Sequence, residues 1–417
     1  MVFGKLPNKA VEAILPCLHE LASFRFIHIV WTFFIWLHGR LIFFFPSDGE
    51  IDGTRFLWYT DSEKKRNKRE ESMSFWEELK NKEAVVMYGM GDGAEKILRV
   101  LESKGVSVSD FFASDGFVRG QSFLGKRVKT LSEIRQSYPS FAIVSAFGSS
   151  LPDVMALFDA LDKTDDLYIP DVSPCGGELF DDAFVSAHRE EIASARSLLS
   201  DSRSREVFDA MIAYRLSGRL SDLKQSECDL GEVWESVLRQ EDAVFVDAGA
   251  YRGDTAAEFI ARRKAETIIA IEPDARSFQK CEAYLSSCGV AYEAHHAAAW
   301  EQDGVLTFAA KGSRASARSQ NGKTVEVAAR SIDSILGGRT VDYIKYDTEG
   351  AEKEALLGSA ETIRACAPDL CVSLYHKSED LFALPLLIKS IQPEYRMYLR
   401  RFPYIPAWDL NLYCVKR

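Results

Sequence analysis

One stretch of this chain constrains its fold more than any other: a buried strand that runs into a glycine turn and then into a helix. The strand is predicted over Ala243–Val246, and the turn has the spacing D-x-G-x-x-x-G from Asp247 to Gly253. A strand, a tight turn and a helix in that order open a parallel sheet with helices on both faces. The pattern therefore predicts an α/β domain over residues 241–417.

Acidic residues end the first two predicted strands of this domain. Asp247 lies beside the glycine turn, where a carboxylate would repel a pyrophosphate but can hold an ammonium group, such as the amino-acid end of S-adenosylmethionine. Glu272 follows the second strand, Thr267–Ile271, where a carboxylate can accept both hydroxyls of a ribose. The alternative role for Glu272 is to cap the helix that begins at Ala275. Together the two acids predict S-adenosylmethionine as the cofactor.

Two later strands bring candidate catalytic residues to the same edge of the sheet. The fourth strand, Val341–Tyr346, ends at Asp347, and the fifth strand, Leu370–Tyr375, ends at His376. Open α/β sheets bind their ligands at the carboxyl ends of the strands. A histidine there can take a proton from a substrate hydroxyl near neutral pH. We expect His376 to be the base and Asp347 the orienting group or alternative base; otherwise His376 caps a helix or bonds to the backbone.

The apolar pattern in the rest of the domain predicts further strands. The pattern predicts a third strand over 291–300, a hairpin of 305–308 with 325–327, and closing strands over 395–401 and 410–415. The neighbouring histidines of the third strand would point to opposite faces, so they cannot share a metal ion.

Four motifs in this region carry a family resemblance. At Asp247-Ala-Gly-Ala-Tyr-Arg-Gly-Asp-Thr, Ile271-Glu-Pro-Asp, Ile344-Lys-Tyr-Asp-Thr-Glu-Gly-Ala-Glu and Ser373-Leu-Tyr-His-Lys, the chain resembles the FkbM family of S-adenosylmethionine-dependent methyltransferases. The resemblance covers residues 240–417 in the family's motif order. It implies a class I methyltransferase, Rossmann-like fold, with a seven-stranded sheet whose last strand is antiparallel, and methyl transfer usually to oxygen. Tyr251 and Arg252 depart from the smaller or amide residues of many relatives, so the loop is expected to be more crowded.

The residues expected to bind the cofactor follow from these motifs. They are Asp247, Gly249, Ala250, Gly253, Thr255, Glu272, Pro273, Asp274 and Asp347.

Residues 73–170 predict a smaller Rossmann-like α/β domain. A buried strand, Ala84–Tyr88, leads into a glycine-rich turn and an amphipathic helix, and a second strand is expected over Val106–Ala113. The spacing of the glycines departs from G-x-G-x-x-G, so the alternative is a structural or substrate-positioning role. The possible second nucleotide site consists of Gly89, Gly91, Gly93 and Asp115.

Between the two α/β domains, residues 171–240 are rich in charge and predict helices over 181–199, 204–216 and 228–239. We interpret this segment as a helical connector or lid.

The first 72 residues differ from the rest of the chain in their amino-acid composition. Nine aromatic residues lie between Phe24 and Phe45, but the apolar run Phe26–Leu37 is shorter than a bilayer-spanning helix and no signal-peptide cleavage site follows it. Glu63–Ser72 has the composition of a translated bacterial ribosome-binding site. The hypothesis is that residues 1–72 are a leader outside the natural protein, which would begin at Met73. The alternative is a membrane-associated or poorly ordered leader, and only then is membrane contact expected.

Charge and cysteine usage limit the partners. The formal net charge of -11, from 51 Lys and Arg against 62 Asp and Glu, argues against a nucleic-acid partner. The eight cysteines show no zinc-ligand spacing, so they predict reduced thiols in a cytoplasmic protein and no metal site. The expected partner is a small-molecule or glycan acceptor, and the oligomeric state stays open.

Two other functions are compatible with these patterns. One is a non-catalytic module in which both α/β units bind nucleotide ligands, with S-adenosylmethionine among them. The other is a nicotinamide-dependent oxidoreductase that uses residues 84–115, although no residues suited to hydride transfer follow that turn.

Overall fold

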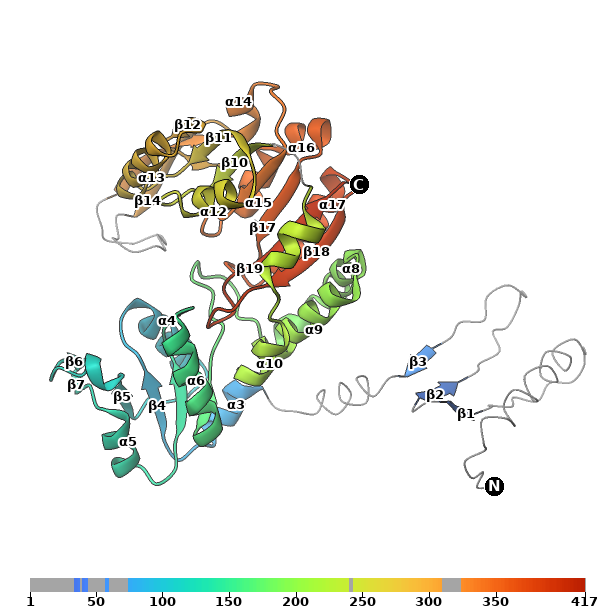
Figure 1. Ribbon diagram of the computed structural model, residues 1–417. Helices are drawn as coiled ribbons and strands as arrows, with labels where there is room; N and C mark the ends of the chain where they lie inside the picture. Colours follow the sequence, from blue (N-terminus) through green and yellow to red (C-terminus); the bar gives the residue numbers. More distant parts are fainter. Residues whose placement is uncertain are drawn as a thin grey trace, which may run out of the picture. The chain divides into compact units, whose positions relative to one another are not determined.

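The computed structural model describes residues 34–37, 40–43, 57–59, 74–239, 243–309 and 324–416 (Figure 1). Met1–Met73 and Ser74–Arg417 form two separate compact units. In the first unit, β1 (Phe34–Leu37), β2 (Arg40–Phe43) and β3 (Leu57–Tyr59) pair in that order as an antiparallel sheet. Most of the expected leader, including Glu63–Ser72, lies outside the described residues. Of the helices that the structure describes, none combines the length and the apolar character needed to cross a bilayer.

The C-terminal part of the second unit is built on a seven-stranded sheet. Its strands are β10 (Ala243–Ala248), β11 (Ala265–Ile271), β12 (Ala291–His295), β16 (Tyr343–Tyr346), β17 (Asp369–Ser373), β18 (Arg396–Arg401) and β19 (Leu410–Val415). They lie in the order β12-β11-β10-β16-β17-β19-β18. The last strand, β19, runs antiparallel to both of its neighbours, and the strands from β12 to β17 are parallel. The predicted class I methyltransferase sheet with an antiparallel last strand is confirmed.

Helices cover both faces of this sheet because its central strands are apolar on both sides. Phe245 packs on one face with Phe259, while its neighbour Val246 packs on the other face with Ile344 and Leu356. The covering helices are α12 (Asp254–Arg262), α13 (Ala275–Ser287), α14 (Ile332–Leu336), α15 (Glu352–Leu357), α16 (Ala360–Cys366) and α17 (Asp380–Ile391).

The predicted third strand is wrong in its length. After β12 the chain turns tightly, with Ala297 N donating to His295 O at 2.9 Å, and it then enters a separate three-stranded sheet as β13 (Ala298–Ala299). That sheet holds the predicted hairpin, β14 (Gly304–Ala309) with β15 (Thr324–Arg330), in antiparallel register. His295 therefore ends a strand, whereas His296 lies in the turn.

The N-terminal part of the second unit is a smaller parallel sheet. Its strands β4 (Val85–Tyr88), β5 (Asp110–Phe112), β8 (Ala142–Ser145) and β9 (Asp166–Tyr168) lie in the order β5-β4-β8-β9. Its helices are α3 (Phe75–Lys80), α4 (Asp92–Ser103), α5 (Leu131–Ser137) and α6 (Pro152–Thr164), and a small hairpin joins β6 (Ser122–Phe123) to β7 (Lys126–Arg127). This arrangement confirms the predicted Rossmann-like unit. The second strand starts later than predicted because Val106 N closes the end of α4 on Leu101 O at 2.8 Å.

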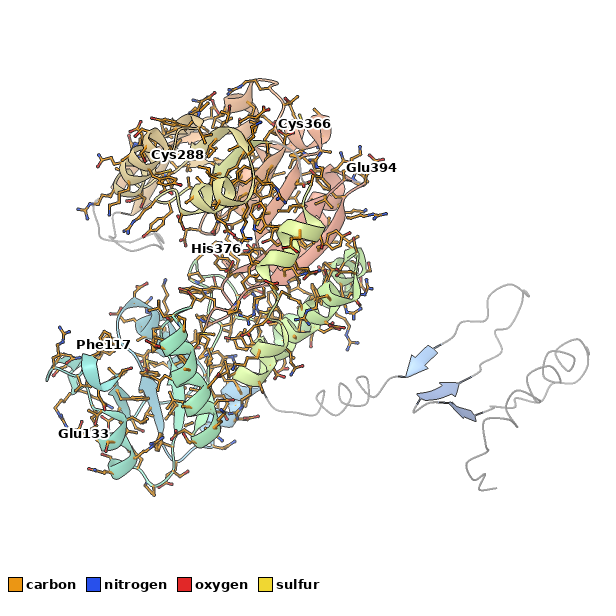
Figure 2. The ribbon with its side chains drawn as sticks, viewed as in Figure 1. Phe117, Glu133, Cys288, Cys366, His376 and Glu394 are labelled. Carbon is orange, nitrogen blue, oxygen red and sulfur yellow. The ribbon has the colours of Figure 1, made fainter. Side chains whose placement is uncertain are left out.

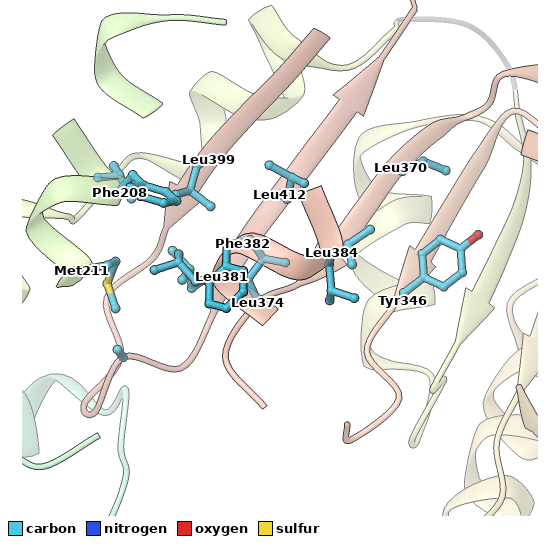
Figure 3. Close-up of a cluster of buried hydrophobic side chains, with 14 of the residues drawn as sticks. Phe208, Met211, Tyr346, Leu370, Leu374, Leu381, Phe382, Leu384, Leu399 and Leu412 are labelled. Carbon is cyan, nitrogen blue, oxygen red and sulfur yellow. The ribbon is translucent and has the colours of Figure 1, made fainter. Parts of the chain in front are cut away.

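Helices between the two sheets pack against the C-terminal one. They are α7 (Asp182–Ala187), α8 (Arg189–Leu198), α9 (Ser202–Ser217), α10 (Leu220–Gln225), α11 (Leu230–Glu232) and the π-helical turn Val233–Val237. Phe208 and Met211 of α9 belong to the same apolar cluster as Leu399 of β18 and Leu412 of β19 (Figure 3). The guanidinium groups of Arg400 and Arg401 are buried under these helices. Of the two interpretations, connector and lid, the packing of α9 on the edge strand favours the connector.

Candidate active site

The glycine turn after β10 is shaped by a close approach of the neighbouring strand. Asp347 N donates to Ala248 O at 2.9 Å, which brings the end of β16 against the turn. Gly249 has a positive φ of 91°, and a Cβ atom there would collide with Asp347 O. At Gly253, with φ 85°, a Cβ atom would lie 2.7 Å from the Tyr284 ring. Both glycines are therefore required by the protein's own packing at the sheet edge.

Asp247 is a buried carboxylate with neither of its oxygens paired. Its side chain is fully buried at the end of β10, and neither oxygen has a hydrogen-bond partner among the described residues. Burial raises the pKa of Asp247 to about 7, against an opposing effect of Lys345. Buried polar groups are nearly always satisfied, so an unpaired carboxylate at a glycine turn fits a cationic group of a ligand.

Glu272 joins the glycine turn to the end of the second strand. Its two carboxylate oxygens accept from Tyr251 N and Asp274 N, both at 2.8 Å. Burial raises the pKa of Glu272 to about 7. Each oxygen keeps lone-pair capacity for a further donor, so the carboxylate fits the hydroxyls of a ribose.

The helix cap after this strand belongs to a different residue. Asp274 accepts from Ser277 N at 2.9 Å and caps α13, so Glu272 is not the cap of this helix. Pro273 O lies 3.1 Å from His296 Nε2, and Ala250 is buried in the turn. Cofactor binding by Ala250, Pro273 and Asp274 stays a prediction.

Lys345 links the start of α12 to Asp347, which follows β16. Its Nζ donates to Thr255 Oγ1 at 2.9 Å and to Asp347 Oδ2 at 3.2 Å, and Asp347 Oδ1 accepts from Tyr375 OH at 2.8 Å. Burial alone would raise the pKa of Asp347, but Lys345 and then His376 lower it. Asp347 is therefore ionised and held in place on both oxygens.

His376, labelled in Figure 2, follows β17. Three carboxylates lie within ion-pair distance of its ring. Nδ1 lies 3.0 Å from Glu352 Oε1, and Nε2 lies 3.7 Å from both Asp347 Oδ1 and Glu349 Oε2. Burial opposes the charged form, but Glu352 above all, and then Asp347 and Glu349, raise the pKa of His376 to about 9. The imidazole is consequently protonated at neutral pH in the ligand-free protein.

The predicted site residues thus meet at one sheet edge, but several of their partners were not predicted. Glu349 and Glu352 belong to the motif I-K-x-D-x-E-G-x-E, so a signal for them existed. Tyr375 and Lys345 lie within the four family motifs, but the motifs assign them no role. The connector supplies the remaining contacts: Ser173 Oγ lies 2.5 Å from His376 O, and Cys175 Sγ donates to Glu349 O at 3.0 Å. No sequence pattern pointed to these long-range contacts.

A cation would find suitable ligand types in this cluster. Potential ligand atoms of Asp347, Glu352 and His376 all lie within 4.8 Å of one another. Tyr375 and Lys345 occupy the oxygens of Asp347, and Glu352 Oε1 accepts from Thr348 N at 2.8 Å. Glu352 Oε2 and His376 Nδ1, by contrast, have no hydrogen-bond partner among the described residues. The expectation of no metal site stays a prediction.

Comparison with known proteins identifies the domain. Residues 247–406 match the family model of the methyltransferase FkbM domain. This part of the chain is an FkbM methyltransferase domain. By sequence, no curated protein matches the chain.

One solved structure agrees with the fold of the FkbM domain, and its similarity extends beyond it. The chain is similar to methyltransferase FkbM from Methylobacillus flagellatus KT, with 21% identity, a TM-score of 0.62, and coverage of 79% of this chain and 89% of that one. At this identity the likeness shows the fold alone, and its coverage reaches into the N-terminal α/β unit. An rRNA methylase from Streptococcus thermophilus has 14% identity and a TM-score of 0.31, and covers 44% of this chain and 92% of its own. A putative methyltransferase from Streptococcus mutans in complex with SAH has 10% identity and a TM-score of 0.31, and covers 45% of this chain and 96% of its own.

Outside the FkbM domain, the glycine turn of the N-terminal unit has a structural explanation. A Cβ atom on Gly89 would lie 2.8 Å from the Phe147 ring, and one on Gly93 would lie 2.9 Å from Ala146 O. Gly91 has φ 105° at the start of α4, where Asp92 and Glu95 occupy the first turn. These carboxylates disfavour a phosphate at this helix end.

Asp115 lies near the same edge of the N-terminal sheet. It is exposed and begins a single 3-10 turn, and its neighbour Ser114 is bonded through Oγ to Tyr88 OH at 2.6 Å, which ties the ends of β4 and β5 together. A second nucleotide site at Gly89, Gly91, Gly93 and Asp115 stays a prediction.

Proposed function

We propose that this chain is an S-adenosylmethionine-dependent O-methyltransferase that acts on a hydroxyl of a sugar, a glycan or another small molecule. The observation that carries the proposal is the meeting of two features at one sheet edge. An unpaired buried carboxylate, Asp247, lies at the glycine turn, and a histidine with a carboxylate on either side lies at the adjoining strand ends. The free cysteines among the described residues agree with a cytoplasmic protein.

In this proposal the residues at the turn bind the cofactor. Asp247 would hold its ammonium group, and Glu272 its ribose hydroxyls. S-adenosylmethionine supplies a methyl group that is already activated by its positively charged sulfur. The protein then has to align the acceptor oxygen with that methyl group and to accept one proton.

His376 is the proposed base and Asp347 the orienting group or alternative base. As the new oxygen–carbon bond forms and the carbon–sulfur bond breaks, the hydroxyl proton passes to the imidazole and S-adenosylhomocysteine leaves. A pKa of about 9 in the free protein leaves little neutral imidazole at pH 7. A cationic cofactor beside His376 lowers that pKa by like-charge repulsion, so cofactor binding favours the neutral form that can accept a proton.

Labelled S-adenosylmethionine offered with sugar, glycan and lipid fractions tests the proposal. We expect label in an acceptor, and the same yield with EDTA present. His376→Ala should lower turnover by about 100-fold with nearly unchanged cofactor affinity, and Glu272→Ala should weaken cofactor binding in calorimetry.

The matched control is His188→Ala, which removes a histidine of the connector instead. Cofactor binding without transfer to any acceptor would favour the non-catalytic module. Unchanged turnover in His376→Ala would refute the assigned base, and unchanged calorimetric binding in Glu272→Ala would refute the ribose contact.

A further inference from the structure

Glu352 is the most deeply buried of the three acids that pair with His376. Its side chain, at the start of α15, is only 1% exposed. Oε1 accepts from Thr348 N at 2.8 Å and from Thr348 Oγ1 at 3.1 Å, so the loop before the helix fixes the carboxylate in place. The His376 ring, also 1% exposed, lies against it. The distance of 3.0 Å from Nδ1 to Oε1 is that of an ion pair, but the two groups are not aligned as a hydrogen bond in the ligand-free protein.

The two ring nitrogens of His376 face different environments. On the Nδ1 side lies the buried carboxylate of Glu352. On the Nε2 side lie Asp347 and Glu349, each at 3.7 Å, whose side chains are 25% and 50% exposed. The partly exposed carboxylates place the solvent nearer to the Nε2 side of the buried ring. Nε2 is therefore the nitrogen nearer to an acceptor, and Nδ1 is the one that faces the buried Glu352.

We propose that Glu352 is a positioning residue for His376: its carboxylate keeps a proton on Nδ1, fixes the plane of the ring and leaves Nε2 to take the proton of the acceptor hydroxyl. This inference rests on the proposed function, because it requires His376 to act on the acceptor. A second nitrogen anchored by a carboxylate is the usual way in which a catalytic histidine is kept in one tautomer.

Other charged groups around the ring have to be separated from the effect of Glu352. The groups that face it or its partners are Asp347, Glu349 and Lys345 from β16 and the loop after it, Lys377 and Asp380 from the start of α17, and Cys175 from the connector. Among them Glu352 has the largest effect in raising the pKa of His376. Removing its charge therefore has an effect that no neighbour replaces.

NMR of the labelled imidazoles tests the positioning role without any need for methyl transfer. The His376 signal is assigned by its absence in His376→Gln. In the unsubstituted chain, we expect the neutral ring to carry its proton on Nδ1. In Glu352→Gln, which keeps the side-chain shape, the pKa of His376 should fall by about one to three units. A neutral ring protonated on Nε2, or an unchanged titration midpoint in the variant, would overturn the inference even where the proposed function holds.

Kinetics gives an independent readout. Glu352→Gln should lower kcat by about 100-fold at pH 9 with the KM for S-adenosylmethionine changed by less than about twofold. Glu352→Asp, which keeps the charge, should restore the titration midpoint of His376 and part of kcat. This variant is the alternative test if Glu352→Gln does not fold. Glu361→Gln on the exposed face of α16 is the control and should change neither quantity. An unchanged kcat in Glu352→Gln also contradicts the inference, whereas an absence of methyl transfer in every variant refutes only the proposed function.

Discussion

At the scale of single residues, the unpaired carboxylate of Asp247 makes a prediction about stability. With a pKa of about 7, well above the usual value of 3.8, the folded protein binds more protons at this group than the unfolded chain does between those two pH values. Stability contributed by this group therefore falls as pH rises through that window. Asp247→Asn removes the penalty, so the free energy of unfolding at pH 8 should rise by about 1 to 3 kcal/mol while cofactor binding is lost.

Urea denaturation of the ligand-free protein at pH 5 and pH 8, with calorimetry of S-adenosylmethionine, measures both effects. The increase in the free energy of unfolding of Asp247→Asn should be larger at pH 8 than at pH 5. Asp162→Asn, an exposed aspartate of α6, is the control and should leave both quantities unchanged. If Asp247→Asn is less stable than the unsubstituted protein at pH 8, the carboxylate has a structural partner within the protein. The assignment of Asp247 to ligand binding would then be contradicted.

The positions of Asp247, Glu272, Asp347 and His376 could be anticipated because each follows a strand, and the carboxyl ends of parallel strands share one edge. The charge states of these four residues could not be anticipated from the sequence. The pKa of His376 depends on the distance to Glu352, which is set by how α15 begins after the loop at Thr348. That geometry is a property of the packed protein and has no signature in residue spacing.

At the scale of elements, the buried arginines of β18 predict how the connector is held. Arg401 is fully buried, and its guanidinium donates to Ser226 Oγ at 2.5 Å, Leu223 O at 3.1 Å and Glu227 Oε1 at 3.2 Å. Removing it leaves these acceptors without their partner. Arg401→Ala should lower the free energy of unfolding by about 3 to 5 kcal/mol.

Thermal and urea unfolding of Arg401→Ala measure this loss. Arg396→Ala, on an exposed position of the same strand, should stay within about 0.5 kcal/mol of the unsubstituted protein. A loss below about 1 kcal/mol in Arg401→Ala would mean that apolar packing alone, such as that of Phe208 on the sheet, holds the connector.

Most strands and helices followed from periodicity, and the exceptions share one cause. The predicted strand over 291–300 divides because the chain turns at His295–Ala297, although the apolar pattern continues through Ala299. The late start of β5 reflects the turn that follows α4, in which Val106 N donates to Leu101 O. In both cases hydrogen bonds of a turn interrupt an apolar run, and hydrophobic pattern alone does not reveal where that happens.

At the scale of the whole molecule, the architecture could be predicted but the contact between its parts could not. Both α/β units could be predicted, since each is built from local strand–turn–helix units. The contacts of Ser173 with His376 and of Cys175 with Glu349 join residues far apart in sequence. Such contacts arise only when the connector is folded onto the FkbM domain, so a single sequence gives no sign of them.

The division of the chain at Met73 leads to the last prediction. Every residue assigned to the site, from Ser173 to His376, lies in the unit Ser74–Arg417, which is compact by itself. A chain that begins at Met73 should therefore fold and keep its affinity for S-adenosylmethionine within about twofold, a difference of about 0.4 kcal/mol. Calorimetry and thermal unfolding of this chain beside the full one measure both properties. A tenfold loss of affinity would show that residues 1–72 contribute to the site, and would refute the hypothesis that they stand outside the chemistry of the protein.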